Sequence, residues 1–521
     1  MAPIMSQPIK RQFRKWLSAR ILDIAERLPP ATKGTLGTLQ HIRDHQRKSA
    51  QDASERTAPP SGTTIDVLSI RLIEHYPIEL IPTLSNWLGY LIPNLEDDFA
   101  QRPFSDSLRT RPSQILGRAW WNLGTLHGKD GGAFFAHRPR LLSGMPPSID
   151  HVAVSLHQVL PSSLSLIFDL RFKPQFTEQI QRIHASKPLP TVIFRQLVPH
   201  GLHAFSHSRA NADAEITNAI RAHISDLILE FLSSLPRMPV GTFAAHAHGR
   251  SVPLPHVITI VLSGAPSSKR SLQKWLEENR LWWSSLGLDL IPYGLFYNGH
   301  SIFSLPEHHF DSRDAPSQLI LLLPNPSSQE APDRESEAFH AATSSAHYTL
   351  DELVQPLTIF ELLRALESDL GNFRYLALRA FMPRRLAPLT LPRLIQATER
   401  VSWATMTLGR LRIEYEQLPS PLSSHFTDIT DFRQFTAPRG RKRRNLPEII
   451  HEGLEWRIDT LQKHADFAQT STTQLAQLRN ATATYVLSIA IALLTIASII
   501  KMSWPKPLVS FLQNLIGPGV R

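Results

Sequence analysis

Runs of Val, Leu and Ile recur between residues 61 and 323, and several of them alternate with polar residues in the manner of β-strands. Asn298-Gly299 separates two of these runs and is the preferred two-residue turn of a β-hairpin. Apolar residues at helical spacing predict two helices in the same region. The predicted strands are 151–160, 163–172, 191–198, 257–262, 290–297, 300–305 and 319–323, and the predicted helices are 214–232 and 271–286. Because hairpins pair their strands antiparallel, we expect an α+β or mixed α/β domain with a mixed sheet over 61–323.

A polar, charged and proline-bearing stretch at 324–347 follows this domain and is predicted to be a linker. Residues 348–480 are predicted to be a helical region, whose last helix begins near Pro447 and meets no further proline before residue 500. Apolar residues recur at 4-3 spacing along this long stalk helix, which is the pattern of a coiled-coil seam. The seam residues are Leu454, Ile458, Leu461 and Leu475. We expect copies of the chain to associate along this seam into a homo-oligomer.

The segment 481–500 reads ATATYVLSIAIALLTIASII and contains no charged residue. A helix of about 20 residues spans the hydrocarbon core of a bilayer, which is about 30 Å thick. We therefore predict a single transmembrane helix at 481–500, followed by an interfacial tail at 501–521, with the lipid bilayer as partner. The residues predicted to flank the anchor are Arg479, Lys501, Trp504 and Lys506.

An α/β domain followed by helices and a long helix that runs into a C-terminal membrane segment resembles the CorA-type divalent-cation channels. The resemblance covers residues 390–521 and implies an oligomeric pore. That family follows its first span with Gly-Met-Asn and then a second span. The corresponding residues here are Lys501-Met502-Ser503, and no second span follows. A channel therefore stays an alternative function.

Residues 1–60 are predicted to be a basic, amphipathic helical region. No secretory signal peptide is visible, because the first residues lack an apolar core segment and a cleavage site. The interpretations are a helix packed on its own domain, a peripheral membrane-binding helix and an organelle transit segment. The apolar positions at helical spacing are Phe13, Trp16, Leu17, Ile21, Ile24 and Leu28, opposite Arg11, Arg14, Lys15 and Arg20.

Composition changes this picture in two ways. The chain of 521 residues has no cysteine, which excludes disulfides, zinc–thiolate sites, iron–sulfur clusters and cysteine catalysis. Its net charge of +10 favours anionic partners. The positive charge is most concentrated in a predicted basic loop, which we interpret as a solvated loop, a patch for an acidic protein or nucleic acid, or a lipid contact. The basic loop consists of Arg439, Arg441, Lys442, Arg443 and Arg444.

Histidines are frequent, but they do not form a recognisable metal site. None has the HExxH spacing that places two ligands on one helix face, so we interpret them as solvated or core residues. The groups are His200, His203 and His207, then His246 and His248, then His308 and His309 with Asp311. No G-x-S-x-G motif occurs, and the glycine-rich stretch 127–132 lacks the frame of a phosphate-binding loop. No catalytic residue, metal ligand or cofactor is assigned.

These observations favour a non-enzymatic, membrane-anchored protein with a cytoplasmic sensing or interaction domain that self-associates through its stalk and membrane helix. The alternatives are a CorA-like channel or another oligomeric pore, and a membrane-tethered enzyme of unrecognised type. Because residues 1–480 precede the anchor without a signal to translocate them, we expect most of the chain in the cytoplasm, at a bacterial inner membrane.

Overall fold

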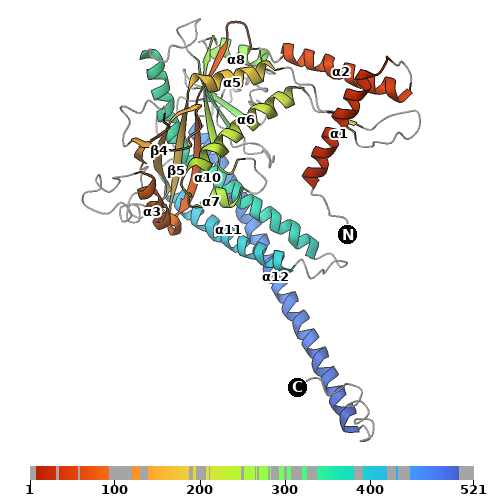
Figure 1. The fold of residues 1–521 in the computed structure, drawn as a ribbon. Helices are drawn as coiled ribbons and strands as arrows, with labels where there is room; N and C mark the ends of the chain where they lie inside the picture. The colour runs from red at the N-terminus through yellow and green to blue at the C-terminus, as the bar shows by residue number, and fades with distance from the viewer. Residues whose placement is uncertain are drawn as a thin grey trace, which may run out of the picture. The chain divides into compact units, whose positions relative to one another are not determined.

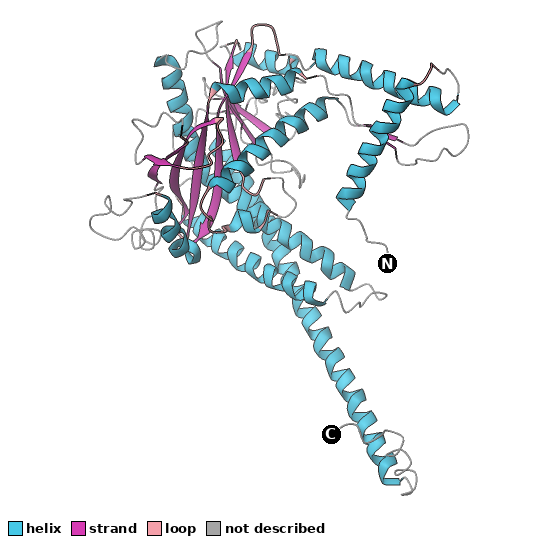
Figure 2. Ribbon diagram, viewed as in Figure 1, coloured by secondary structure: helices cyan, strands magenta, loops and turns pink. Residues whose placement is uncertain are grey.

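A computed structural model gives the fold of the chain, and Figure 2 distinguishes its helices, strands and loops. The residues it describes are 7–30, 34–56, 59–92, 120–129, 139–186, 192–194, 207–209, 212–247, 252–264, 266, 269–279, 282, 293–297, 302–306, 320–324, 337–380, 391–418, 430–431 and 446–503. The chain divides into two compact units. One is Met1–Ala365 with Ile413–Arg457, and the other is Leu366–Arg412 with Ile458–Arg521.

The first unit is built on a ten-stranded sheet with the order β12-β9-β10-β11-β8-β1-β5-β4-β2-β3. Its central strand is β1 (Thr64–Pro77), which pairs antiparallel with β5 (Ser163–Phe172) on one side and β8 (His256–Ser263) on the other. The remaining strands are β2 (Trp120–His127), β3 (Pro139–Leu141), β4 (Ile149–Leu160), β9 (Tyr293–Tyr297), β10 (Ile302–Pro306), β11 (Ile320–Pro324) and β12 (Thr430–Asp431). The β8–β11 and β2–β3 pairs are parallel, so the predicted mixed sheet is confirmed.

The two predicted hairpins are both present as antiparallel pairs. Strands β4 and β5 pair over most of their length on either side of Pro161 and Ser162, and β9 pairs with β10 on either side of the Asn298-Gly299 position. The central strand β1 was not predicted. Arg71, Glu74 and His75 interrupt its apolar run, and a strand buried on both faces has no simple alternation of apolar and polar residues.

One face of the sheet is apolar and carries helices α3 (Ile81–Leu91), α5 (Pro174–Ala185) and α6 (Ala212–Ser234). Figure 1 shows α5 and α6 crossing this face. Phe168 of β5 lies at its centre, with its ring centroid 5.6 Å from that of Phe231 on α6 and 6.4 Å from that of Trp87 on α3. At the end of the same strand, the rings of Phe172 and Phe176 stack at 4.2 Å. Burial of these aromatic side chains contributes to the core of the unit.

The N-terminal region forms a hairpin of two helices, α1 (Gln7–Arg27) and α2 (Gly34–Arg56). Leu22 and Ala25 of α1 are buried with Leu39 and Ile42 of α2. The apolar face proposed from the sequence is only partly used, because Trp16, Ile24 and Leu28 stay 45–60% exposed.

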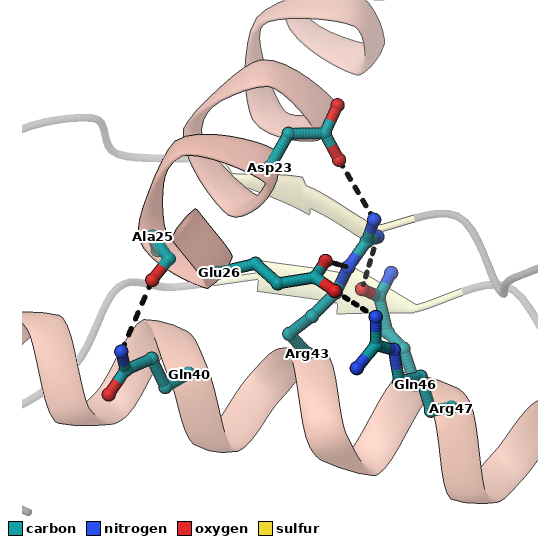
Figure 3. A network of polar contacts seen from close by, with 7 residues as sticks. All are labelled: Asp23, Ala25, Glu26, Gln40, Arg43, Gln46 and Arg47. Atoms are coloured by element: carbon teal, nitrogen blue, oxygen red, sulfur yellow. Dashed lines mark hydrogen bonds and ion pairs between the residues drawn. The ribbon is translucent and has the colours of Figure 1, made fainter. Parts of the chain in front are cut away.

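A polar network closes the hairpin beside that small core (Figure 3). Arg43 of α2 pairs with Asp23 at 2.8 Å and with Glu26 at 2.9 Å, both on α1, and Arg47 pairs with Glu26 as well. The Gln40 side-chain amide donates to the Ala25 carbonyl at 3.2 Å, near the end of α1. In this structure the helix packs within its own chain, as the first interpretation of residues 1–60 expects.

Three long helices follow the sheet domain: α10 (Glu337–Ala380), α11 (Leu391–Gln417) and α12 (Leu446–Ser503). The stalk prediction is consistent with α12, which is continuous over 58 residues. Helix α11 lies beside it, since Tyr415 Oη is 2.8 Å from His451 Nδ1, and Arg412 pairs with Asp459. The seam residues Leu454, Ile458 and Leu461 are at most 3% exposed, so this single chain already covers them.

The predicted transmembrane helix is contradicted. Among the residues described, no helix is long and apolar enough to span a bilayer. The expectations of a single-pass anchor at 481–500 and of a location at a bacterial inner membrane are therefore corrected.

Candidate functional site

The second face of the sheet is polar, although it is buried. Residues paired across antiparallel strands share a face. On this face the pairs are Ser69 with Arg171, Arg71 with Asp169, and His75 with Ser165. The exposed fraction is 0% for Ser165, 5% for Arg71 and 7% for Asp169. Because an antiparallel sheet usually turns its polar face to water, the burial of this one needs a partner that can satisfy it.

Two guanidinium groups and two carboxylates form an ionic network on this polar face. Arg71 Nη1 is 2.6 Å from Asp351 Oδ1 of α10, and Arg71 Nε is 3.4 Å from Asp169 Oδ2. Arg171 Nη2 is 3.2 Å from the same Asp169 oxygen. Burial raises the pKa of Asp351 and lowers the pKa of Arg171, while the opposite charges beside each group counteract both shifts. The four charges balance, so removal of one leaves its partners buried and uncompensated.

Helix α10 covers the polar face with one polar stripe of its own. Asp351, Gln355 and Thr358 are spaced four and three residues apart, which places them on one side of a helix. Besides the Asp351 ion pair, the Gln355 amide donates to the Val159 carbonyl of β4 at 2.7 Å. Thr358 Oγ1 is 3.1 Å from Ser165 Oγ of β5. The stripe thus contacts three different strands through three kinds of polar group.

A buried carboxylate lies near the end of β1, beyond the residues that pair with β8. The β8 pairing stops at Leu72, and helix α7 (Thr242–Ala245) contacts β1 there. Glu74 is 0% exposed, and it accepts hydrogen bonds from the backbone N–H groups of His75, Phe243 and Ala244 at 3.0, 2.8 and 3.0 Å. These bonds fix the first turn of α7 to the central strand.

Glycine is required at position 241 for this arrangement. A Cβ atom there would lie 2.6 Å from the Glu74 carboxyl group and 2.6 Å from the His75 carbonyl oxygen. Real Cβ atoms do not come so close, so the short approach of α7 to Glu74 depends on Gly241. We refer to Glu74, His75, Gly241 and Thr242 as the Glu74 clasp.

Burial perturbs the protonation of the groups around the clasp. It raises the pKa of Glu74 to about 7, although the three N–H donors and the His246 charge act in the opposite direction. It lowers the pKa of His75 to about 4, so this imidazole is neutral near pH 7. Burial, with the Arg71 charge, also lowers the pKa of His157 on the polar face to about 3. The clasp therefore holds a titratable carboxyl beside a neutral histidine.

Several atoms of the polar face have no hydrogen-bond partner among the described residues. They are Ser69 Oγ, Ser163 Oγ, Thr259 Oγ1 and His75 Nε2. Ser69 and Thr259 face each other across β1 and β8. The other ring nitrogen of His75 is satisfied, at 2.9 Å from Thr242 Oγ1. The described residues thus satisfy the polar groups of this face only in part.

Of the histidines singled out from the sequence, the structure brings His246 toward the clasp. Its Nδ1 is 2.6 Å from the Thr242 carbonyl, and it is half-buried. The other candidates lie outside the described residues or have side chains that do. These are His200, His203, His207, His248, His308, His309, Asp311, the basic loop Arg439, Arg441, Lys442, Arg443 and Arg444, and also Leu475, Arg479, Lys501, Trp504 and Lys506.

Sequence reasoning missed Arg71, Glu74, Asp169 and Asp351. The available signal was the presence of charged residues inside apolar runs, at Arg71 and Glu74 in 65–76 and at Asp169 in 163–172. A charge in such a run is buried and must be paired. Within the described part of the chain, no three His, Cys, Asp or Glu side chains are grouped so as to hold a metal ion.

Comparison with known proteins gives no family for this chain. No protein-family model matches it, and no curated protein is significantly similar to it.

Proposed function

We propose that this chain is a non-enzymatic interaction protein that self-associates through the apolar end of helix α12. In this proposal the sheet domain is the sensing or interaction module, and the helices that follow it carry the means of assembly. The buried carboxyl and imidazole of the Glu74 clasp are covered: Glu74 and His75 are 0% and 3% exposed. A substrate could not reach them in this conformation, which supports a binding role over a catalytic one.

The observation that carries the proposal is a run of large apolar side chains at the end of α12 that one copy of the chain leaves in water. Leu487, Ile491, Leu493, Leu494 and Ile496 are 52–71% exposed. These positions lie on all sides of the helix, and a helix that is apolar all round is normally buried. Full burial of one such side chain contributes about 1.5–3 kcal/mol, so packing five half-exposed ones contributes roughly 4–7 kcal/mol per helix.

The rest of α12 gives a reason why this end is the one that associates. Leu454, Ile458 and Leu461 are already covered within the chain, and so are Ala465 and Ala468 at 0% and 2% exposed. A second copy could use them only by displacing what covers them. The apolar end needs no such opening, so we place self-association there.

The test replaces two exposed leucines by polar residues of similar size. Leu493→Gln with Leu494→Gln should reduce the assembled mass measured by light scattering toward that of one chain. Leu229→Gln on α6 is the matched control, because Leu229 is also exposed, at 42%, but lies on another element. An unchanged mass in the double variant would refute the proposal, and so would a full chain that is monomeric and instead partitions into liposomes.

A further inference from the structure

Helix α1 buries one face against α2 and exposes large apolar side chains on another. Leu22 and Ala25 are 1% and 2% exposed on the side that meets α2. Away from α2, Trp16 and Ile24 are 55% and 60% exposed, and Leu28, the first residue after the helix, is 45% exposed. Large apolar side chains that are exposed together on one face are typical of an interaction site, so this face of α1 is a candidate contact surface for another molecule.

Basic residues lie among these apolar ones. Trp16, Arg20 and Ile24 follow one another at intervals of four residues, and Arg27 and Leu28 come three and four residues after Ile24. Such intervals place side chains on the same side of a helix, and both arginines are exposed there. The Arg20 guanidinium lies 5.8 Å above the Trp16 ring, so it stays within this row of side chains. We refer to these five residues as the α1 stripe.

The α1 stripe carries positive charge that the acidic residues of α1 do not neutralise. These acidic residues are Asp23 and Glu26, and both pair with arginines of α2 (Figure 3). No carboxylate among the described residues pairs with Arg20 or Arg27. A partner that buries the apolar residues of the stripe must therefore bring negative charge to the two guanidinium groups, because a cation buried without a counter-charge is strongly destabilising.

The position of the arginines distinguishes between three occupants. A helix that lies in a bilayer surface keeps its cations on the polar face, opposite its apolar side chains. Here Arg20 lies between Trp16 and Ile24, where insertion would carry it into the apolar layer. A second copy of the stripe would bring arginines against arginines, and such juxtaposition of like charges is destabilising. A partner helix with carboxylates among its apolar residues satisfies both kinds of side chain.

We propose that the α1 stripe binds an amphipathic helix of a partner protein, whose apolar face carries Asp or Glu side chains opposite Arg20 and Arg27. Trp and Arg are enriched among the residues that dominate binding energy at protein interfaces, so Trp16 and Arg20 are the expected anchors. This inference does not rest on assembly through α12, because the stripe lies on a different element. It gives the chain a second contact, made with a different protein.

The test selects helices from a displayed library of amphipathic peptides of about 18 residues, or five turns. In the library, the positions beside the apolar residues are Glu, Lys or Gln at random, and the full-length chain is the bait. We expect the enriched peptides to carry Glu at these positions. The Kd of one enriched peptide, measured by fluorescence anisotropy, should rise about tenfold or more with Trp16→Ala.

A charge reversal tests the role of Arg20 directly. Arg20→Glu should weaken binding of the enriched peptide about tenfold or more and should bind the same peptide with Lys in place of Glu, because the opposite charges are restored. Unfolding of the hairpin cannot produce this gain, so the reversal decides the matter even if Trp16→Ala loosens α1. If Arg20→Glu gains no affinity for the Lys peptide, the proposed charge pairing is wrong.

Val240→Ala is the matched control, because Val240 is apolar and 63% exposed but lies outside α1, and it should change the Kd less than about twofold. Equal enrichment of Lys and Glu, or unchanged affinity of the Trp16→Ala chain, would overturn the proposal. So would binding to phosphatidylserine vesicles that Trp16→Ala abolishes, if no peptide is enriched. A lower light-scattering mass of the Arg20→Glu chain would assign the stripe to self-association instead. Loss of assembly in the Leu493 and Leu494 variant, with peptide binding retained, leaves this inference standing.

Discussion

The protonation of Glu74 offers a test in which two physical effects compete. Three backbone N–H donors favour the ionised carboxylate and would lower its pKa, whereas complete burial favours the neutral acid and raises it. In this structure burial dominates, and the pKa of Glu74 rises from 4.5 to about 7. The perturbation that isolates the group is Glu74→Gln, which keeps the shape of the side chain and removes its titration.

The direction of the pH dependence follows from the linkage between proton binding and folding. Between the unfolded pKa of 4.5 and the folded pKa of about 7, the folded state binds more protons than the unfolded state at this site. The contribution of Glu74 to stability is therefore present at low pH and is lost as the pH rises through this window. A shift of that size corresponds to about 3 kcal/mol. The free energy of unfolding of the native chain, minus that of the variant, should fall by about this amount from pH 4 to pH 8.

The assay is urea unfolding of both proteins across this pH range, followed by circular dichroism. Buried histidines contribute in the opposite direction, since the lowered pKa values of His75 and His157 make stability rise with pH up to about 6.5. They are present in both proteins and cancel in the difference. A difference that stays constant with pH would show that the N–H donors and burial balance, and one that rises with pH would show that the donors outweigh burial. Either result would refute the reasoning.

The remaining predictions concern the Glu74 clasp and the ionic network. Gly241→Ala should lower the free energy of unfolding by about 2–4 kcal/mol in a denaturant titration, because the added Cβ would lie 2.6 Å from Glu74 and from the backbone of His75. Gly89→Ala, where nothing lies within 4 Å, should be neutral or slightly stabilising in α3. Arg71→Met should cost about 3–5 kcal/mol and Asp351→Asn clearly less, since Arg71 is 5% exposed and serves both carboxylates. Equal stability of the native chain and Arg71→Met would contradict the network.

The parts of the fold that could be predicted are those determined by local sequence. The turn at Pro161 and Ser162 indicated the β4–β5 hairpin, and the Asn298-Gly299 pair indicated β9 and β10, because turn residues act over a few positions. The proline-free stretch after Pro447 predicted the long α12. The central strand β1 could not be predicted from local sequence, since its place in the sheet depends on strands more than 80 residues away in the chain.

The candidate site could not be predicted for the same reason. His246 was singled out, but nothing near it in the sequence points to Glu74, which meets α7 across a separation of about 170 residues. Asp351 and Arg71 are 280 residues apart. The prediction of a membrane anchor was wrong for the opposite reason, because it relied on local sequence alone. A local apolar pattern was sufficient to suggest it, and the described residues of α12 do not form a long enough apolar helix.

The central claim is that this chain assembles with copies of itself through the apolar end of α12. Its most direct test is sedimentation equilibrium of the full-length chain over a range of concentrations, compared with the chain truncated after Arg479. The account predicts a mass of at least two chains for the full-length protein and a mass below the 58.7 kDa of one full chain for the truncated one. A full-length mass of 58.7 kDa at every concentration, or assembly of the truncated chain to the same number of copies, would contradict it.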